Sequence, residues 1–184
     1  MQRTMEVIAS SDRWPEMYAR EAEQLRRVLG DEIVRIHHIG STSVPGLAAK
    51  PVIDILVEVH SVEALDGYAA AMQTLGYEPR GEFGIPGRRY YPKGGDLRTH
   101  HVHAFASGDP HVFRHLAFRD YLRTHPECAV AYGEVKRRAA AAHRTDPEGY
   151  VEYKRAFVER TLEDAVHWVR KDASSRTTTE EECG

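Results

Sequence analysis

The chain has few cysteines, no long apolar run and little net charge, and each shortage argues against a class of protein. Its two cysteines are Cys128 and Cys183, and the second lies in a polar segment, so we expect no structural disulfide. No stretch approaches the roughly 20 apolar residues that span a bilayer, and the first 14 residues contain no signal-peptide core. A net charge of -3 gives no argument for nucleic acid or membrane as partner. We therefore expect a cytoplasmic protein that binds no membrane and for which nucleic acid is not an expected partner.

Several common catalytic motifs are also missing. The chain has no Walker A pattern, no G-x-G-x-x-G fingerprint and no motif around either cysteine. The run GSTSVPG lacks the strand-to-helix context of a nucleophile elbow. These absences argue against P-loop enzymes, Rossmann enzymes and serine hydrolases of the G-x-S-x-G type.

What is present is the composition of a soluble globular protein, with 41% hydrophobic and 29% charged residues among 184. Apolar periodicity and the positions of Gly and Pro predict helices and strands in a definite order. The expected helices span 12–29, 62–75, 110–124, 126–143 and 147–171, and the expected strands span 33–39, 52–59, 77–83, 88–93 and 98–106. This order predicts an α+β fold with a mixed β-sheet flanked by helices and a helical C-terminal third. We expect one domain over residues 1–172 and a disordered polar tail over residues 173–184.

The first candidate site is a Gly-Ser turn followed by a carboxylate in an apolar strand. Gly40 and Ser41 precede Asp54, which lies within the run VIDILVEV. A turn of this kind can present backbone N–H groups to a phosphate, and a nearby carboxylate can hold a divalent cation. The same residues also fit a tight turn and a hydrogen-bonded buried Asp. Leu56 occupies the next position on the Asp54 face, where a site for two metals would want a second carboxylate.

The second candidate is the histidine cluster in RTHHVHAF. His101 and His103 share one face of the expected strand, an arrangement that can bind a metal or a phosphate, whereas His100 points the other way. Histidines that are simply satisfied at a strand edge fit equally well. If this strand pairs with the Asp54 strand, the imidazoles complete a mixed site, which favours Mn, Zn or Fe over Mg.

Basic residues form the third candidate. They are Lys50, which lies just before the Asp54 strand, and Arg88, Arg89 and Arg98. The arginines lie in the hairpin that we expect strands 88–93 and 98–106 to form around the GGD turn. Such groups can neutralise a triphosphate or another anion, although each alone also fits a surface charge.

Several of these sequence runs resemble those of a known family. The run HHIGSTSVPGLAAKPVIDILVEV, followed by RTHHVHAF and HLAFRDYLRTHPE, resembles the GrpB family. The early pair Trp14 and Tyr18 and the late run YVEYKRAFV also fit, so the resemblance covers residues 7–168.

The resemblance implies a nucleotidyltransferase-superfamily fold, whose signature is a Gly-Ser turn and then a strand with two carboxylates. Gly40 and Ser41 match the turn, and Asp54 matches the first carboxylate. Leu56 departs from the second, which leaves catalysis open although the fold is implied. A domain similar to GrpB is also found behind dephospho-CoA kinase in some bacteria, which suggests a role near nucleotide or coenzyme metabolism.

The leading hypothesis is a metal-dependent nucleotidyltransferase that acts on a small acceptor. Its predicted catalytic and metal-binding residues are Asp54, His101 and His103, with Mg, Mn or Zn as the divalent metal. Its predicted phosphate-binding residues are Gly40, Ser41, Thr42, Lys50, Arg89 and Arg98. The first alternative is a module that binds a nucleotide, a CoA-like molecule or another phosphate ligand in the same pocket without chemistry. The second is a histidine-based, metal-dependent hydrolase or sensor.

Overall fold

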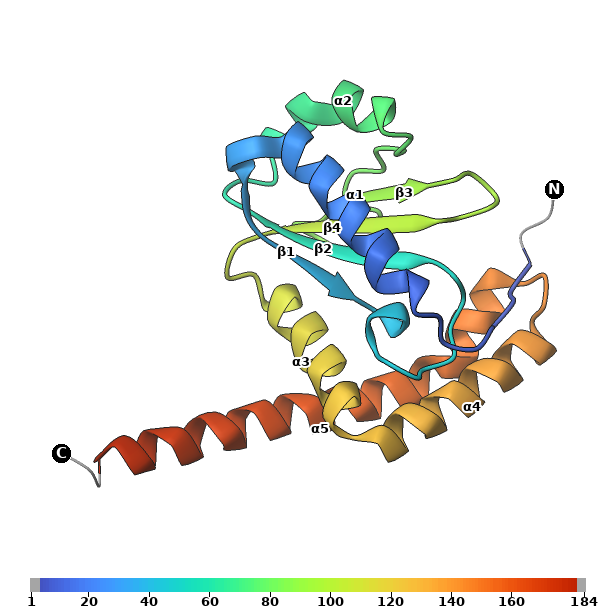
Figure 1. The fold of residues 1–184 in the computed structure, drawn as a ribbon, viewed down its shortest axis with the longest axis vertical. Helices are drawn as coiled ribbons and strands as arrows, with labels where there is room; N and C mark the ends of the chain where they lie inside the picture. The colour runs from blue at the N-terminus through green and yellow to red at the C-terminus, as the bar shows by residue number, and fades with distance from the viewer. Residues whose placement is uncertain (1–3, 182–184) are drawn as a thin grey trace.

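The computed structural model describes the backbone of residues 4–181 and the side chains of residues 4–172. The helices are α1 (Arg13–Leu29), α2 (Ala69–Thr74), α3 (Pro110–Thr124), α4 (Pro126–Ala142) and α5 (Pro147–Glu181). The strands are β1 (Ile33–Ile39), β2 (Ile53–Val59), β3 (Arg89–Lys93) and β4 (His100–Ala106). This arrangement confirms the predicted α+β class and the helical C-terminal third (Figure 1).

The four strands form one mixed sheet in the order β1-β2-β4-β3. Strand β2 is antiparallel to β1 and parallel to β4, and β3 is antiparallel to β4 as the predicted hairpin requires. In the parallel pair, Asp54 stands opposite His101 and Leu56 stands opposite His103. The sequence could place the histidines on one face of a strand, and this register places them beside Asp54.

Helices cover both faces of the sheet. Helix α1 lies across one face, where its apolar stripe packs against alternate residues of the central strands, among them Ile53, Ile55 and Val102 (Figure 1). On the other face, Val112 of α3 packs with Leu56 of β2. Asp54 is two residues before Leu56, so it shares this second face.

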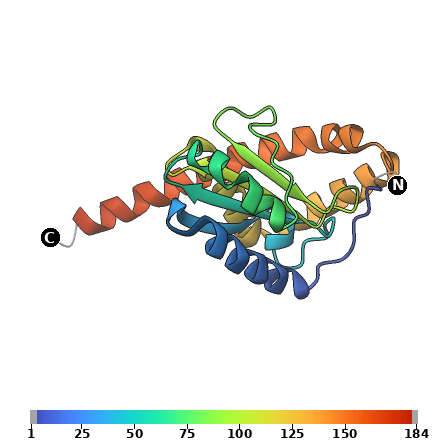
Figure 2. The same ribbon diagram turned by 90° about the horizontal axis from the view of Figure 1, so that it is seen from above.

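Helices α3, α4 and α5 form a layer beside the loop that joins β1 to β2. Val44 and Leu47 of this loop pack in one buried cluster with Leu122, Ala129 and Tyr132 of the helices. The helical layer is therefore fixed next to the Gly-Ser turn. In both views the last turns of α5 extend beyond the body of the protein (Figures 1 and 2).

Three local predictions differ from the structure. Residues 77–83 form no named strand, although the backbone runs beside β3 as far as Gly81. Tyr77 makes an isolated bridge with Lys93, and the N–H groups of Glu78 and Arg80 donate to the carbonyls of Pro92 and Tyr90. Positive φ angles at Gly81, Phe83 and Gly84 then turn the chain away from the sheet. The predicted helix 62–75 is divided into a 3-10 segment, Ala64–Tyr68, and the short α2. The 3-10 segment contains Gly67, and glycine weakens a helix interior.

The third difference concerns the end of the chain. Helix α5 continues to Glu181, so it includes residues 173–181, for which the composition predicts a disordered tail. No Gly or Pro lies between Gly149 and Gly184 to end the helix. Residues 182–184 lie outside the described residues, and the domain boundary at residue 172 stays a prediction.

None of the described helices is long and apolar enough to cross a membrane.

Candidate functional site

Asp54, His101 and His103 converge at the centre of the sheet. His101 Nδ1 lies 3.0 Å from Asp54 Oδ1, and His103 Nε2 lies 3.8 Å from the same oxygen. One ligand atom from each of the three side chains lies within 4.8 Å of the others. His100 faces the opposite side, where its Nε2 is 3.9 Å from Glu21 of α1. The structure thus confirms the predicted alternation along this strand.

These three side chains fit a divalent metal. The Nε2 atom of His101 is buried and has no hydrogen-bond partner among the described residues, which a metal or ligand would satisfy. One carboxylate with two imidazoles is a donor set that suits Zn or Mn, whereas Mg prefers oxygen ligands. Of the three predicted metals, Zn and Mn therefore fit better than Mg.

The directions of the pKa shifts of Asp54 and His103 favour the forms that bind a metal. Burial tends to raise the pKa of Asp54, but hydrogen bonds and charge from His101 and His103 outweigh it and hold that pKa well below its usual range. Burial lowers the pKa of His103, although Asp54 opposes the effect. An ionised carboxylate and a neutral imidazole are the forms that coordinate a metal.

Gly40 makes the close approach of the turn to Asp54 possible. Its φ is +68°, and a Cβ atom added there would lie only 2.4 Å from Asp54 Oδ2. Any side chain at this position would displace the carboxylate. The glycine of the Gly-Ser turn is thus required by both the backbone conformation and the space beside the predicted metal ligand.

A cavity of about 230 Å³ opens beside this group. The turn and loop contribute Gly40, Ser41, Thr42, Ala49, Lys50 and Val52, the sheet contributes Asp54 and His101, and the helices contribute Phe118, Tyr132, Lys136, Tyr150 and Lys154. Four of the predicted phosphate-binding residues therefore line one cavity with Asp54 and His101. The hydroxyl of Thr42 is already engaged, because it donates to the Val52 carbonyl and lies 3.0 Å from His38 Nε2.

Three predicted residues do not line the cavity: His103, which lies behind it beside Asp54, and the basic residues Arg89 and Arg98. Arg89 binds Asp66 through two hydrogen bonds of 2.7 and 2.9 Å, and Arg98 lies 3.4 Å from Glu78. Arg89 stands opposite Ala104, whose side chain is in the core on the α1 face. Strand alternation therefore directs Arg89 away from the histidines.

The neighbouring Arg88 takes the position predicted for Arg89. It is buried, and its Nη1 lies 3.5 Å from His103 Nδ1. His115 of α3 also stands near His103, with ring centroids 5.8 Å apart, and burial lowers the pKa of His115 to about 4. Arg88 belongs to the basic group that the sequence offers, and strand alternation favours it over Arg89. Tyr90 lies opposite His103, and Arg88 is two residues from Tyr90, so it shares that face of the sheet.

Lys136 and Lys154 are further residues that the sequence did not indicate. They lie about 80 and 100 residues after Asp54 on helices α4 and α5, where a lone lysine carries no motif. Only the folded arrangement brings them to the Gly-Ser turn.

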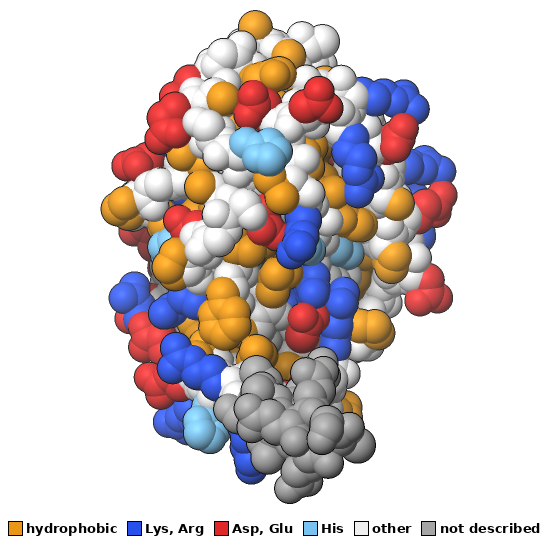
Figure 3. All heavy atoms as spheres, turned by 90° about the vertical axis from the view of Figure 1, so that its left-hand side faces the viewer, with side chains coloured by type: hydrophobic (Ala, Val, Ile, Leu, Met, Phe, Trp, Pro, Cys, Tyr) orange, Lys and Arg blue, Asp and Glu red, His pale blue; other side chains and the backbone are white. Residues whose placement is uncertain are grey.

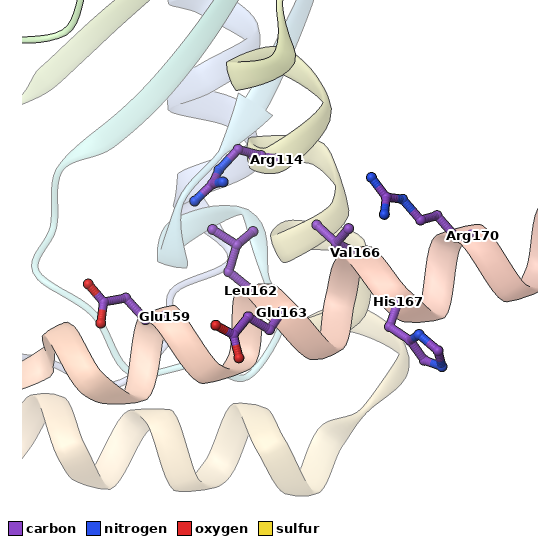
Figure 4. Close-up of a pocket in the computed structure, with 7 residues that line it drawn as sticks. All are labelled: Arg114, Glu159, Leu162, Glu163, Val166, His167 and Arg170. Atoms are coloured by element: carbon purple, nitrogen blue, oxygen red, sulfur yellow. The ribbon is translucent and has the colours of Figure 1, made fainter.

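A second hollow, of about 410 Å³, lies between α3 and α5 and contains none of the predicted site residues (Figure 4). Arg114 and Leu162 point toward each other, whereas His167 points away (Figure 4). Glu159, Glu163 and Arg170 also line it, so its charge is mixed. The face of the protein drawn in Figure 3 likewise has acidic and basic side chains interspersed. Neither surface has the excess of lysine over carboxylate that is found in the cavity at Asp54.

Comparison with known proteins places this chain in a family. A family model described as GrpB protein matches residues 4–164. The UPF0157 protein YqkA of Bacillus subtilis (strain 168) is 47% identical over 166 residues, which are 90% of this chain and 48% of YqkA. The chain thus spans about half the length of that relative.

Two further comparisons agree. The crystal structure of conserved protein GrpB from Enterococcus faecalis superposes with a TM-score of 0.86 and 41% identity, and the match covers 89% of this chain and 99% of that one. A dephospho-CoA kinase of Mycolicibacterium paratuberculosis is 29% identical over 88% of this chain and 46% of the kinase. The family model, the sequence relative and the structure agree, and the chain belongs to the GrpB family.

Proposed function

We propose that this protein catalyses metal-dependent nucleotidyl transfer from a nucleoside triphosphate to a small acceptor. The observation that carries the proposal is the joint lining of one cavity by the Gly40–Ser41 turn, by Asp54 and His101, and by lysines. A carboxylate–imidazole metal site beside a cationic pocket is the minimum equipment for transfer of a phosphorus-centred group.

Each group of residues has a distinct role in this proposal. Asp54, His101 and His103 hold the metal, which would supply charge neutralisation at the phosphate oxygens. The Gly40–Ser41 turn positions the phosphates, and Lys50 offsets their charge. The oxygen of an acceptor hydroxyl attacks the α-phosphorus and its proton passes to solvent, while the bond from that phosphorus to its bridging oxygen breaks and pyrophosphate leaves.

The test is pyrophosphate release. Purified protein is incubated with each nucleoside triphosphate, with Mn²⁺, Zn²⁺ or Mg²⁺ and with a panel of small acceptors. We expect release that depends on metal and acceptor and that falls at least 100-fold in Asp54→Asn. Asp31→Asn, which changes an exposed carboxylate remote from the cavity, is the matched control and should leave the rate unchanged. An Asp54→Asn variant as active as the unmodified protein would eliminate the proposal.

A second candidate function is supported by Leu56. Its side chain is fully buried with Ile39, Phe105 and Val112, so an apolar cluster occupies the position of the superfamily's second carboxylate. Without that ligand, the pocket could bind a metal–nucleotide complex and transfer nothing. This alternative predicts thermal stabilisation by nucleotide plus metal, with no pyrophosphate released for any acceptor.

A further inference from the structure

Lys136 is the most unusual charged residue of the protein. Its side chain is 2% exposed, and its Nζ atom is buried without a hydrogen-bond partner among the described residues. It nevertheless lines the cavity beside Asp54. An ammonium group left unpaired in the interior is costly, so the cavity is incomplete without an anion.

Two further lysines converge on the same space. The Nζ atoms of Lys50 and Lys154 lie 4.4 and 4.5 Å from the centre of the Tyr150 ring, and Lys136 Nζ lies 4.5 Å from the Tyr132 ring. The negative faces of these rings stabilise the ammonium groups partly. Three separate parts of the chain thus direct cationic groups into one cavity: the β1–β2 loop, α4 and α5.

Lysines outnumber carboxylates among the described residues that line the cavity. Asp54 is the one carboxylate among the lining residues, against three lysines. Burial and mutual repulsion lower the pKa of Lys136, and burial lowers the pKa of Lys154. Perturbed groups that converge in a cavity are typical of a binding site rather than of a structural ion-pair network.

The structure points to a ligand with several phosphates. We propose that Lys50, Lys136 and Lys154 form a subsite for a linear polyphosphate chain. Binding at this subsite follows from the geometry of the cavity, whereas its role in a reaction rests on the proposed function. A single phosphate group carries a charge of roughly -2 at most. One phosphate presents that charge at a single point, whereas the three ammonium groups approach from the β1–β2 loop, α4 and α5. A chain of phosphates carries charge along its length and so suits groups that come from different elements.

The test measures binding of inorganic triphosphate by calorimetry, with EDTA present and with inorganic phosphate and sulfate as competing probes. We expect triphosphate to bind at least ten-fold more tightly than either. Lys136→Met and Lys154→Met remove the charge and keep the chain length, so each should weaken triphosphate binding at least ten-fold. Lys171→Met changes an exposed lysine of α5 outside the cavity and should have no effect.

Circular dichroism and urea unfolding verify that the variants fold. We expect both variants to be at least as stable as the unmodified protein, because each substitution removes a buried charge. Equal affinity for all three anions, or unchanged affinity in folded Lys136→Met and Lys154→Met, would overturn the inference.

The same variants separate this inference from the proposed function. If triphosphate binds through the lysines but no pyrophosphate is released from any nucleotide, the subsite stands and the transferase proposal fails. If nucleotide is turned over and the lysine variants keep the KM for nucleotide, the transferase proposal stands and the subsite fails.

Discussion

At the scale of single residues, the contact between Gly40 and Asp54 connects backbone geometry to the site. Gly40 adopts φ +68°, and an added Cβ would overlap Asp54 Oδ2. We expect Gly40→Ala to cost about 1–3 kcal/mol, because φ +68° with ψ -172° is a conformation that only glycine adopts readily, and in addition to displace the carboxylate. The free energy of unfolding and the affinity for Mn²⁺ or Zn²⁺ measure these two effects separately.

Gly46→Ala is the matched control for this substitution. Gly46 has φ +77°, but nothing lies within 4 Å of its added Cβ. It should therefore show the backbone cost alone and bind metal normally. Equal metal affinity in both variants would show that Gly40 does not position Asp54.

Leu56 occupies the position where a site for two metals would want a second carboxylate. Its side chain is 0% exposed. We expect Leu56→Asp to destabilise the protein by more than the 2–5 kcal/mol typical of a Leu→Ala cavity, because it adds a buried charge to the lost packing. Urea unfolding of Leu56→Asp beside Leu56→Ala measures the difference.

Metal titration of Leu56→Asp and Leu56→Ala, together with their stabilities, can contradict this expectation. A Leu56→Asp protein as stable as Leu56→Ala, with a gain in metal affinity, would show that the fold tolerates the two-carboxylate motif and that the apolar cluster is not the obstacle.

At the scale of elements, sequence reasoning succeeded where periodicity is strong and local. Strand β1, Ile33–Ile39, matches its prediction, and so does the start of α3 at Pro110 behind the capping Asp109. The hairpin was predictable from its turn, but the parallel pairing of β2 with β4 was not, because no local signal encodes contact between strands more than 40 residues apart. This pairing is what turns the HxH strand and Asp54 into one site.

Helices α4 and α5 give an expected pH dependence. Burial, together with the charges of Lys154 and Arg137, lowers the pKa of Lys136 from 10.5 to about 7. Between pH 7 and 10.5 the unfolded chain binds a proton at this lysine that the folded protein does not, so the free energy of unfolding rises with pH in this range. The slope attributable to Lys136 is at most about 1.4 kcal/mol per pH unit.

The charged and titratable groups that face Lys136 come from every side of the cavity: Lys50, Asp54, His101, Tyr132, Arg137, Tyr150 and Lys154. Urea unfolding from pH 7 to 10 should therefore be compared between the unmodified protein and Lys136→Met, in which the other groups are retained. In Lys136→Met the free energy of unfolding should rise less steeply with pH than in the unmodified protein. Identical slopes in the two proteins would contradict a lowered pKa for the buried Lys136. Triphosphate binding should change in the opposite direction and weaken as pH rises through this range.

At the scale of the whole molecule, the cavity lies where three parts of the protein meet: the sheet, the β1–β2 loop and the helical layer. The loop contacts the helices through Val44 and Leu47, and the lysines approach the turn from α4 and α5. The turn and Asp54 were predictable because they lie in one short run with a recognisable pattern. The lysines of α4 and α5 were not, because a lone lysine on a distant helix carries no motif and only the fold brings it to the cavity. A ligand that fills the cavity would connect all three parts.

Hydrogen exchange can show this connection directly. We expect triphosphate to slow amide exchange in residues 40–52, in α4 and in the first turns of α5, because opening any of these parts would expose the bound anion. Exchange in α1 and α2 should change little, since α1 packs on the opposite face of the sheet and neither helix lines the cavity.

The Lys136→Met and Lys154→Met double variant is the control for this measurement, because it keeps the apolar contacts of the helical layer and removes two of the three converging charges. Protection confined to residues 40–52, or protection that is the same in the double variant, would mean that α4 and α5 only support the loop. Protection that extends over the loop and both helices and disappears with the lysines would show that the helical third of the chain is part of the binding site.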